Sequence, residues 1–290
     1  MNSAEEKAMK RPPRKPDWLK IKLPRGFKSS QVVGLLNGGH IHTICSSGMC
    51  PNKGECWGNG TATFMIGGDT CTRNCKFCNV KSGKCLPLDP EEINKISDAI
   101  KELNIRHAVI TSVDRDDLPD FGANHWKNMI DKIKTDNPGV TIEALIPDFQ
   151  GKRDLIDIVA GSMPEVISHN LETVERLTTE VRSVATYKGS LKVLEYLANK
   201  GLKTKSGIML GLGESRDEIL KTMDDLLEIG CKIMTIGQYL QPSVKHYPLK
   251  EYIHPDTFEE YRLIGKEKGF LHIESSPLVR SSYHAEKHIW

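Results

Sequence analysis

The sequence predicts an α/β fold, an open (β/α)6 partial barrel of parallel strands with helices on its outer side. From residue 61 onward, short β-rich runs alternate with longer segments whose apolar residues keep helical spacing. Strands and helices that alternate at these lengths favour a parallel sheet covered by helices. Six units are too few for a closed eight-stranded barrel. An open barrel fits the count, and a doubly wound sheet is the alternative from periodicity alone.

The expected elements follow one another along the chain. The predicted strands cover residues 61–66, 107–112, 140–146, 165–168, 204–210 and 232–237. The helices between them are predicted near residues 89–103, 123–135, 152–160, 171–178, 188–200 and 215–229. A helix over 256–268 and a strand-like run over 270–274 follow. We expect three parts: an N-terminal extension (1–60), the β/α core (61–250) and a C-terminal extension (251–290).

The composition of the chain argues against a nucleic-acid-binding, membrane-spanning or secreted protein. The chain has 290 residues and a net charge of only +2, which does not suggest a nucleic-acid binder. No apolar run approaches the roughly 18 residues of a membrane span. The first seven residues lack the apolar stretch of a secretory signal. We therefore expect a soluble cytoplasmic protein that contacts neither membrane nor nucleic acid.

The cysteines are strongly clustered. Six of the eight lie between Cys45 and Cys78. In a reducing compartment such clusters bind metal more often than they form disulfides. Cys85 and Cys231 stand alone, and we expect both to be small buried hydrophobic residues.

Cys71, Cys75 and Cys78 follow the first predicted strand with the spacing C-x3-C-x2-C. Three thiolates on one short loop can hold three corners of a cubane [4Fe–4S] cluster. The fourth iron would then lack a protein ligand, so a small molecule can bind there. A zinc site or a disulfide is the alternative, but zinc usually takes four ligands and C-x2-C pairs.

Cys45, Cys50 and Cys56 form another triad, with the spacing C-x4-C-x5-C. Since it comes earlier in the chain, we call it the first triad. Glycine and proline interrupt this segment, as a loop folded around a metal requires. Three more thiolates suit three irons of another cubane, so the two triads indicate two clusters. His40 and His42 lie just upstream and are alternative ligands, although a packed or exposed histidine is commoner.

Polar residues follow each predicted strand, where parallel barrels carry their chemistry. These segments include Thr111–Leu118, Pro147–Phe149, His169–Thr173, Gly211–Glu214 and Gln238–Pro242. Ordinary helix capping is the alternative explanation, for example at Asn170 and Ser215.

The cysteine loop at residues 67–80 resembles the signature of the radical S-adenosylmethionine (SAM) enzymes. In that superfamily the open iron chelates the amino and carboxyl groups of SAM. The aromatic residue before the last cysteine, here Phe77, lies near the adenine. The resemblance implies the radical SAM type of (β/α)6 barrel.

Four features together resemble the lipoyl synthase family over about residues 14–286. They are the two cysteine triads, the segment Thr235–Pro242 and the sequence Arg-Ser-Ser-Tyr at residues 280–283. The resemblance implies that Cys45, Cys50 and Cys56 hold an auxiliary [4Fe–4S] cluster with Ser282 as its fourth ligand. It implies that the other triad holds the cluster that cleaves SAM. Cys85 and Glu175 depart from the family pattern, which often has proline there, but neither is at a ligand position.

The resemblance also implies the reaction. A 5′-deoxyadenosyl radical from SAM removes hydrogen from C6 of an octanoyl chain on a carrier-protein lysine, and a second SAM repeats the step at C8. Two sulfur atoms from the auxiliary cluster enter the chain. An unactivated C–H bond has no acidic proton, so a cofactor radical must break it. The implied partners are octanoylated lipoyl carriers (glycine-cleavage H protein or 2-oxoacid dehydrogenase lipoyl domains) and an electron donor such as ferredoxin or flavodoxin.

The segment His169–Glu172 resembles the ribose-binding segment of biotin synthase, a related sulfur-inserting enzyme. The resemblance places Asn170 and Glu172 on the ribose hydroxyls of SAM and Arg182 near its carboxylate. An amide and a carboxylate suit a diol, and a guanidinium suits a carboxylate.

The sequence leaves two other functions as alternatives to a lipoyl synthase. Another sulfur-inserting radical SAM enzyme, such as biotin synthase, is disfavoured by the N-terminal triad and the serine near the end of the chain. A non-catalytic iron–sulfur electron carrier belongs to a different class. Such a carrier needs no loop with an open iron on a β/α scaffold.

Overall fold

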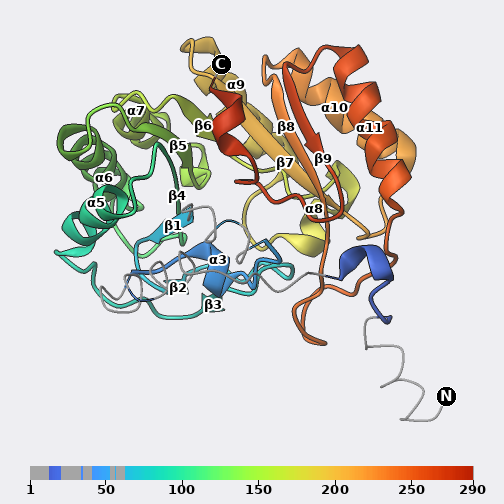
Figure 1. Cartoon of the computed structure of the whole chain (residues 1–290), viewed down its shortest axis with the longest axis horizontal. Helices are drawn as coiled ribbons and strands as arrows, with labels where there is room; N and C mark the ends of the chain where they lie inside the picture. The colour runs from blue at the N-terminus through green and yellow to red at the C-terminus, as the bar shows by residue number, and fades with distance from the viewer. Residues whose placement is uncertain (1–12, 21–33, 35–40, 53–55, 57–62, 290) are drawn as a thin grey trace.

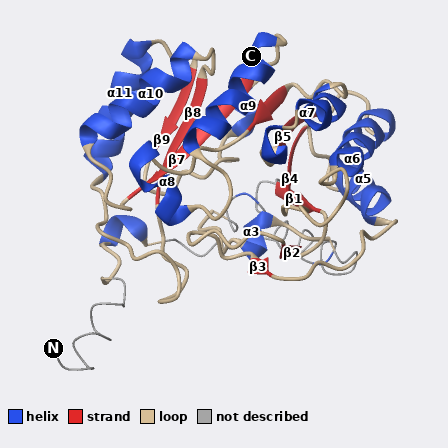
Figure 2. Ribbon diagram, turned by 180° about the vertical axis from the view of Figure 1, so that it is seen from behind, coloured by secondary structure: helices blue, strands red, loops and turns tan. Residues whose placement is uncertain are grey.

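The computed structural model describes residues 13–20, 34, 41–52, 56 and 63–289. Seven strands form one sheet in the order β1-β4-β5-β6-β7-β8-β9, and every neighbouring pair is parallel. Within these residues β1 and β9 are the two edges of the sheet, so the barrel is open (Figures 1 and 2). The predicted partial barrel of parallel strands is confirmed.

The strands lie within two residues of their predicted bounds. They are β1 (Thr63–Ile66), β4 (His107–Ser112), β5 (Thr141–Leu145), β6 (Val166–Ser168), β7 (Thr204–Leu210), β8 (Ile233–Gln238) and β9 (His272–Ser275). The strand-like run predicted over 270–274 adds β9 to the sheet beside β8. A separate short pair, β2 (Thr70–Cys71) and β3 (Lys81–Ser82), brackets the cysteine loop.

The helices pack on the outer side of the curved sheet (Figure 1). The longer ones are α5 (Glu92–Glu102), α6 (Ala123–Asp136), α7 (Arg153–Ala160), α8 (Glu175–Val181), α9 (Tyr187–Asn199), α10 (Arg216–Glu228) and α11 (Pro255–Lys268). Shorter elements are α3 (Ile44–Ser47) and the 3-10 turns η1 (Asp17–Leu19), η2 (Phe149–Gly151) and η3 (Ala285–His288). Among the described helices none is long and apolar enough to cross a membrane.

Two predicted helix starts are wrong. The helix predicted at residue 89 begins at Glu92, because Asp89 forms a turn in which its carboxylate accepts from the backbone N–H of Glu91 at 2.9 Å. The helix predicted over 171–178 begins at Glu175 instead. The preceding residues are not helical, since Glu172 has a φ of 69° and pairs with β7 through its N–H and the carbonyl of Gly207 at 2.9 Å. Asn170 is therefore not a helix cap, whereas Ser215 forms a full capping box at α10.

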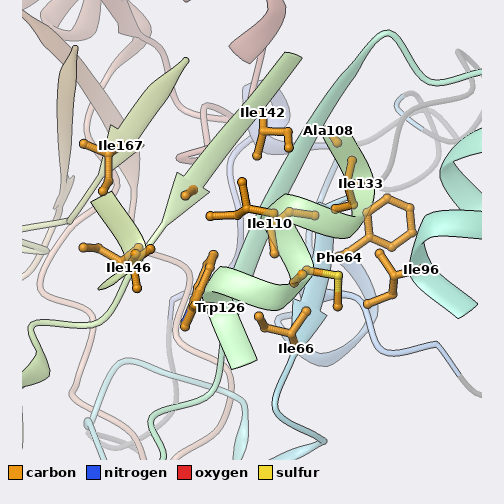
Figure 3. Close-up of a cluster of buried hydrophobic side chains, with 14 of the residues drawn as sticks. Phe64, Ile66, Ile96, Ala108, Ile110, Trp126, Ile133, Ile142, Ile146 and Ile167 are labelled. Carbon is orange, nitrogen blue, oxygen red and sulfur yellow. The ribbon is translucent and has the colours of Figure 1, made fainter. Parts of the chain in front are cut away.

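Burial of apolar side chains holds the helices against the sheet. Figure 3 shows one hydrophobic cluster, in which Trp126 of α6 packs with Ile110 of β4 and neighbouring isoleucines. The indole N–H of Trp126 donates to the Ser112 hydroxyl at 3.2 Å, which satisfies its only polar atom. A second cluster packs β7–β9 against α8–α11 and includes the buried Cys231, as predicted.

A buried ion pair cross-links the middle of the sheet. Lys205 of β7 donates to both carboxylate oxygens of Glu143 in β5, at 2.9 and 2.8 Å. Ser168, on the strand between them, donates to the same carboxylate at 2.9 Å. Both charged side chains are 0% exposed. Since a lone buried charge is strongly unfavourable, each partner requires the other.

Replacing Lys205 by Met is expected to destabilise the protein by about 3–5 kcal/mol, because the Glu143 carboxylate is left buried without a counter-charge. The double variant Lys205→Met/Glu143→Leu is expected to recover most of that loss. The matched control is Arg216→Met, which removes an exposed pair with Glu260 and is expected to change stability by less than about 1 kcal/mol. Urea unfolding under anaerobic conditions measures all three. Equal destabilisation in the single and double variants would contradict this account.

Candidate active site

One cavity of about 290 Å³ lies at the carboxyl ends of the strands and is lined by both ends of the chain. The cysteine loop contributes Cys71, Cys75 and Cys78. The N-terminal triad segment contributes Ile44, and the C-terminal segment contributes residues 279–281. The structure therefore brings the two sequence regions with predicted cluster ligands to a common space.

The cysteine loop is held at both of its ends and in its middle. The N–H of Gly83 donates to the carbonyl of Cys71 at 2.9 Å, which closes the loop beside β2 and β3. Midway, the N–H of Lys76 donates to Val181 at 2.8 Å, and its carbonyl accepts from Tyr247 at 2.7 Å. These bonds fix the loop against α8 and against the segment after β8.

The thiols suit a metal cluster chemically. Burial raises the pKa of Cys71 to about 12, with the nearby Asp114 carboxylate as a further cause. Burial raises the pKa of Cys78 to about 11. Bare thiolates are thus disfavoured, and a bound metal cation would supply the positive charge that deprotonates them. Two backbone N–H groups, those of Arg73 and Asp114, donate to the Cys71 sulfur at 3.4 and 3.3 Å.

Nowhere in the described chain do three histidine, cysteine or acidic side chains converge closely enough to hold a single metal ion. The three thiols of the loop instead face the cavity from separate positions. Three thiols on one loop are the donor set that a cubane uses at three of its irons. The residues present fit a [4Fe–4S] cluster.

Arg73 inside the cysteine loop is the most heavily paired charge at this site. Its guanidinium contacts Asp116 at 2.7 and 2.9 Å, Asp148 at 2.8 Å and Asp114 at 3.3 Å. Burial alone would raise the pKa of Asp116 and of Asp148, but the Arg73 guanidinium holds both pKa values below the usual range. The pKa of Asp114 is raised, chiefly by burial.

Sequence reasoning missed this network. The acids follow β4 and β5, in polar segments that the sequence predicts to lie at the site, but no local pattern pairs them with Arg73. The signal in the sequence is an arginine inside the cysteine loop, with acidic residues shortly after the next two strands. Because carboxyl ends of neighbouring parallel strands lie side by side, such charges are expected to meet.

The first triad packs against the hydrophobic cluster of β1, β4 and β5. Cys45 is buried, and Cys50 and Cys56 are partly buried beside it. The amide of Asn52, between them, donates to the carbonyl of Leu278 at 2.7 Å. The C-terminal segment thereby lies against the first triad.

Ser282 lies at the start of β1, where its hydroxyl accepts from Thr63 at 2.8 Å. The side chain of Asn79 donates to the carbonyl of Ser47 at 2.8 Å, so the two triad segments also touch.

His40 lies outside the described residues. His42 lines a separate small cavity with Cys85, which is only partly buried and donates to the carbonyl of Thr70 at 3.0 Å. The expectation of a buried Cys85 is wrong, since its thiol finds a polar partner.

The four residues expected to contact SAM all line the cavity: Phe77, Asn170, Glu172 and Arg182. The Asn170 side-chain oxygen is buried without a hydrogen-bond partner, which is unusual for a buried acceptor. Burial raises the pKa of Glu172, while the Arg182 charge and a hydrogen bond from Asn170 oppose that shift. An unpartnered amide oxygen beside a carboxylate fits a ligand that brings hydroxyl donors.

The side chains of Arg182 and His169 make hydrogen bonds that fix the segment around Asn170. Arg182 donates to the carbonyl of Asn170 at 3.1 Å and to the Ser190 hydroxyl at 2.9 Å. His169 bonds to Ile146 at 3.0 Å and to the same hydroxyl at 2.9 Å. Burial lowers the pKa of His169 to about 4, so the imidazole is neutral.

Solved structures share this fold at low sequence identity. Methylornithine synthase (PylB) matches with a TM-score of 0.55 at 13% identity, covering 82% of this chain and 74% of that one. Streptococcus suis SuiB matches with a TM-score of 0.59 at 14% identity, covering 85% of this chain and 52% of that one. At these identities the likeness concerns the fold alone.

Comparison of sequences is more specific. The Radical SAM superfamily model matches residues 65–226. A lipoyl synthase of Treponema denticola is 61% identical over 276 residues, covering 95% of both chains. A lipoyl synthase of Phocaeicola vulgatus is 59% identical, covering 95% of this chain and 97% of that one. With one cysteine triad at the cavity and the other packed against the hydrophobic cluster of the same open β/α barrel, this chain belongs to the lipoyl synthase family of radical SAM enzymes.

Proposed function

We propose that Cys71, Cys75 and Cys78 hold the SAM-cleaving cluster and that Cys45, Cys50, Cys56 and Ser282 hold the auxiliary cluster of the lipoyl synthase reaction. The enzyme inserts sulfur at C6 and C8 of a protein-bound octanoyl chain, with SAM and two [4Fe–4S] clusters as cofactors. The observation that carries the assignment of residues is the single cavity reached by the cysteine loop and by the segments next to the first triad and Ser282.

Bound at these residues, one cluster supplies the electron that cleaves SAM to a 5′-deoxyadenosyl radical and the other supplies the two sulfur atoms. The protein contributes position and exclusion of water. Much of the cavity wall is apolar, with side chains that include Ile44, Met65, Leu145, Ile208 and Val279. An apolar wall suits an octanoyl chain, and its aliphatic C–H bonds are poor hydrogen-atom donors to a carbon radical.

The polar side of the cavity holds SAM in this proposal. Asn170 and Glu172 bind the ribose hydroxyls, and Phe77 packs beside the adenine. Arg182 contributes positive charge toward the SAM carboxylate while one of its nitrogens holds the Asn170 carbonyl. The unpartnered Asn170 oxygen supports this arrangement, because a ribose hydroxyl would supply the missing donor.

Two protein partners are part of the proposed function: a carrier of the octanoyl chain and an electron donor. The enzyme acts on octanoylated lipoyl carrier proteins, and we propose a glycine-cleavage H protein or a 2-oxoacid dehydrogenase lipoyl domain as the carrier. A ferredoxin or flavodoxin is the proposed electron donor, and the proposed location is the cytoplasm. The proposed division is an extension with the auxiliary cysteines (1–60), the radical SAM core (61–250) and an extension with the serine ligand (251–290).

Anaerobic reconstitution with iron and sulfide tests the function. With SAM, a reductant and an octanoyl-lysine peptide, the protein is expected to release 5′-deoxyadenosine and add two sulfur atoms to the peptide, both measured by mass spectrometry. Cys75→Ala is expected to abolish both products, because the SAM-cleaving cluster loses a ligand. An electron carrier would show reversible reduction without SAM cleavage, and that result in the reconstituted wild type would refute the proposal.

Replacing Arg73 by Lys is expected to weaken the SAM-cleaving cluster selectively. A lysine ammonium cannot reproduce the forked contacts to three carboxylates, so the cysteine loop loses its link to the ends of β4 and β5. We expect SAM cleavage to fall at least about tenfold and the electron paramagnetic resonance signal of this cluster to change. The control is Arg176→Lys, which alters an exposed pair with Glu218. Matching spectra for wild type and Arg73→Lys would show that the network does not position the loop.

Glu172→Gln and Asn170→Ala are expected to weaken SAM binding by about tenfold each, since each removes a hydrogen bond worth roughly 1.5 kcal/mol. Asn94→Ala serves as the control, because its amide contacts only the exposed Glu91 carboxylate at 3.1 Å. Equilibrium binding of SAM to the reconstituted protein measures the effect. Unchanged affinity in both site variants would remove these residues from the proposed SAM site.

A further inference from the structure

The last residues of the chain cross the open barrel from one end of its strands to the other. After β9 the carbonyl of Pro277 accepts from Gln238, at the carboxyl end of β8, at 3.3 Å. The next residues line the cavity, and Ser282 then meets Thr63 at the amino end of β1. Figures 1 and 2 show this segment returning to a helical turn beside the opposite ends of the strands. We call residues 276–288 the C-terminal strap.

The strap passes so close to β8 that a side chain does not fit between them. A Cβ built on Gly237 would lie 2.2 Å from the carbonyl oxygen of Val279, which is backbone and cannot rotate away. Gly237 belongs to the segment Thr235–Pro242 that resembles the family, and this contact gives its glycine a physical role. The strap therefore depends on glycine at this position.

The C-terminal end of the strap packs against the barrel at the amino ends of the strands. The helical turn η3 lies against β4, and His288 within it is 1% exposed. Its ring lies 5.6 Å from that of His272, the first residue of β9. Lys203, just before β7, donates to the carbonyl of Ile289. The turn thus contacts the amino ends of strands from both halves of the sheet.

His288 acts in this anchor by packing. Neither of its ring nitrogens has a hydrogen-bond partner, and the same holds for Nε2 of the neighbouring His107. Burial lowers the pKa of His288 to about 3, and the charge of Lys205 and the nearby His272, His107 and His284 act in the same direction. A neutral, unpartnered ring can be replaced by an apolar side chain of similar size without losing a hydrogen bond.

We propose that Gly237 and the η3 anchor are positioning elements for the auxiliary cluster, which hold Ser282 at its ligand position by fixing both ends of the strap. Ser282 lies between the two fixed points, only three residues from each of Val279 and Ala285. The inference rests on the proposed function, since it takes Ser282 to be the fourth ligand. It adds residues that touch neither cluster nor substrate but on which the serine ligand depends.

The test uses Gly237→Ala and a deletion of residues 285–290, each reconstituted anaerobically as the full holoenzyme. Wild type is expected to hold about eight iron atoms per chain, four for each cubane. Both variants are expected to lose about half, as measured by iron analysis and Mössbauer spectra. Each is expected to keep 5′-deoxyadenosine formation while sulfur insertion falls at least tenfold. Full iron content with normal sulfur insertion in both variants would overturn the proposal.

Matched variants separate positioning from general damage. Gly265→Ala is also a buried glycine change, but Gly265 lies in α11, and its Cβ would meet the rotatable end of the Ile273 side chain at 2.3 Å rather than the backbone of the strap. It is expected to keep both clusters. His288→Leu is expected to retain iron and sulfur insertion, whereas His288→Asp is expected to behave like the deletion. Parallel loss of iron from both clusters in Gly237→Ala would overturn the proposal, because the strap would then only support the fold.

Ser282→Ala separates this inference from the proposed function. Loss of auxiliary iron in Ser282→Ala, together with normal iron in Gly237→Ala and in the deletion, refutes the strap while leaving the serine as ligand. Normal iron and sulfur insertion in Ser282→Ala refutes the ligand assignment itself. The two failures therefore give different patterns across the same set of variants.

Discussion

The buried guanidinium of Arg73 is the interaction on which the geometry of the site depends. A charge this deep is stable only with counter-charges and full hydrogen bonding, and three carboxylates from two other loops provide them. The cysteine loop cannot shift without breaking these pairs. The fixed loop in turn directs its thiols into the cavity and holds two backbone N–H groups against the Cys71 sulfur.

The openness of the barrel has a structural use. A closed parallel barrel fills its interior with layers of its own side chains. Here the edges β1 and β9 are unpaired with each other among the described residues, and the cavity and the C-terminal strap occupy the interior. Both sets of proposed auxiliary ligands come from outside the six β/α units. The fold thus brings an N-terminal and a C-terminal segment, which are distant in sequence, into contact with each other and with β1.

The sequence predicts the strands and most of the helices well, but not the contacts between distant segments. The bounds of the strands can be predicted from their apolar residues, because these are the residues that the fold buries. The start of α8 is misplaced because Glu172 pairs with β7, which no local pattern reveals. The spacing of the cysteines alone indicates iron–sulfur clusters, with no need of the structure. The ion pairs of Arg73 join side chains from segments far apart in the chain, and the need for glycine at residue 237 comes from the backbone of Val279, so neither follows from a local pattern.

The central claim is that two separate iron centres lie on one cavity of this open barrel. An anaerobic crystal structure of the reconstituted protein, with anomalous data collected at the iron absorption edge, tests it most directly. The account predicts two iron peaks, one bound by the thiols of the cysteine loop and one bound by the N-terminal thiols with the Ser282 oxygen at ligand distance. A single iron peak, or zinc in both places, would contradict it.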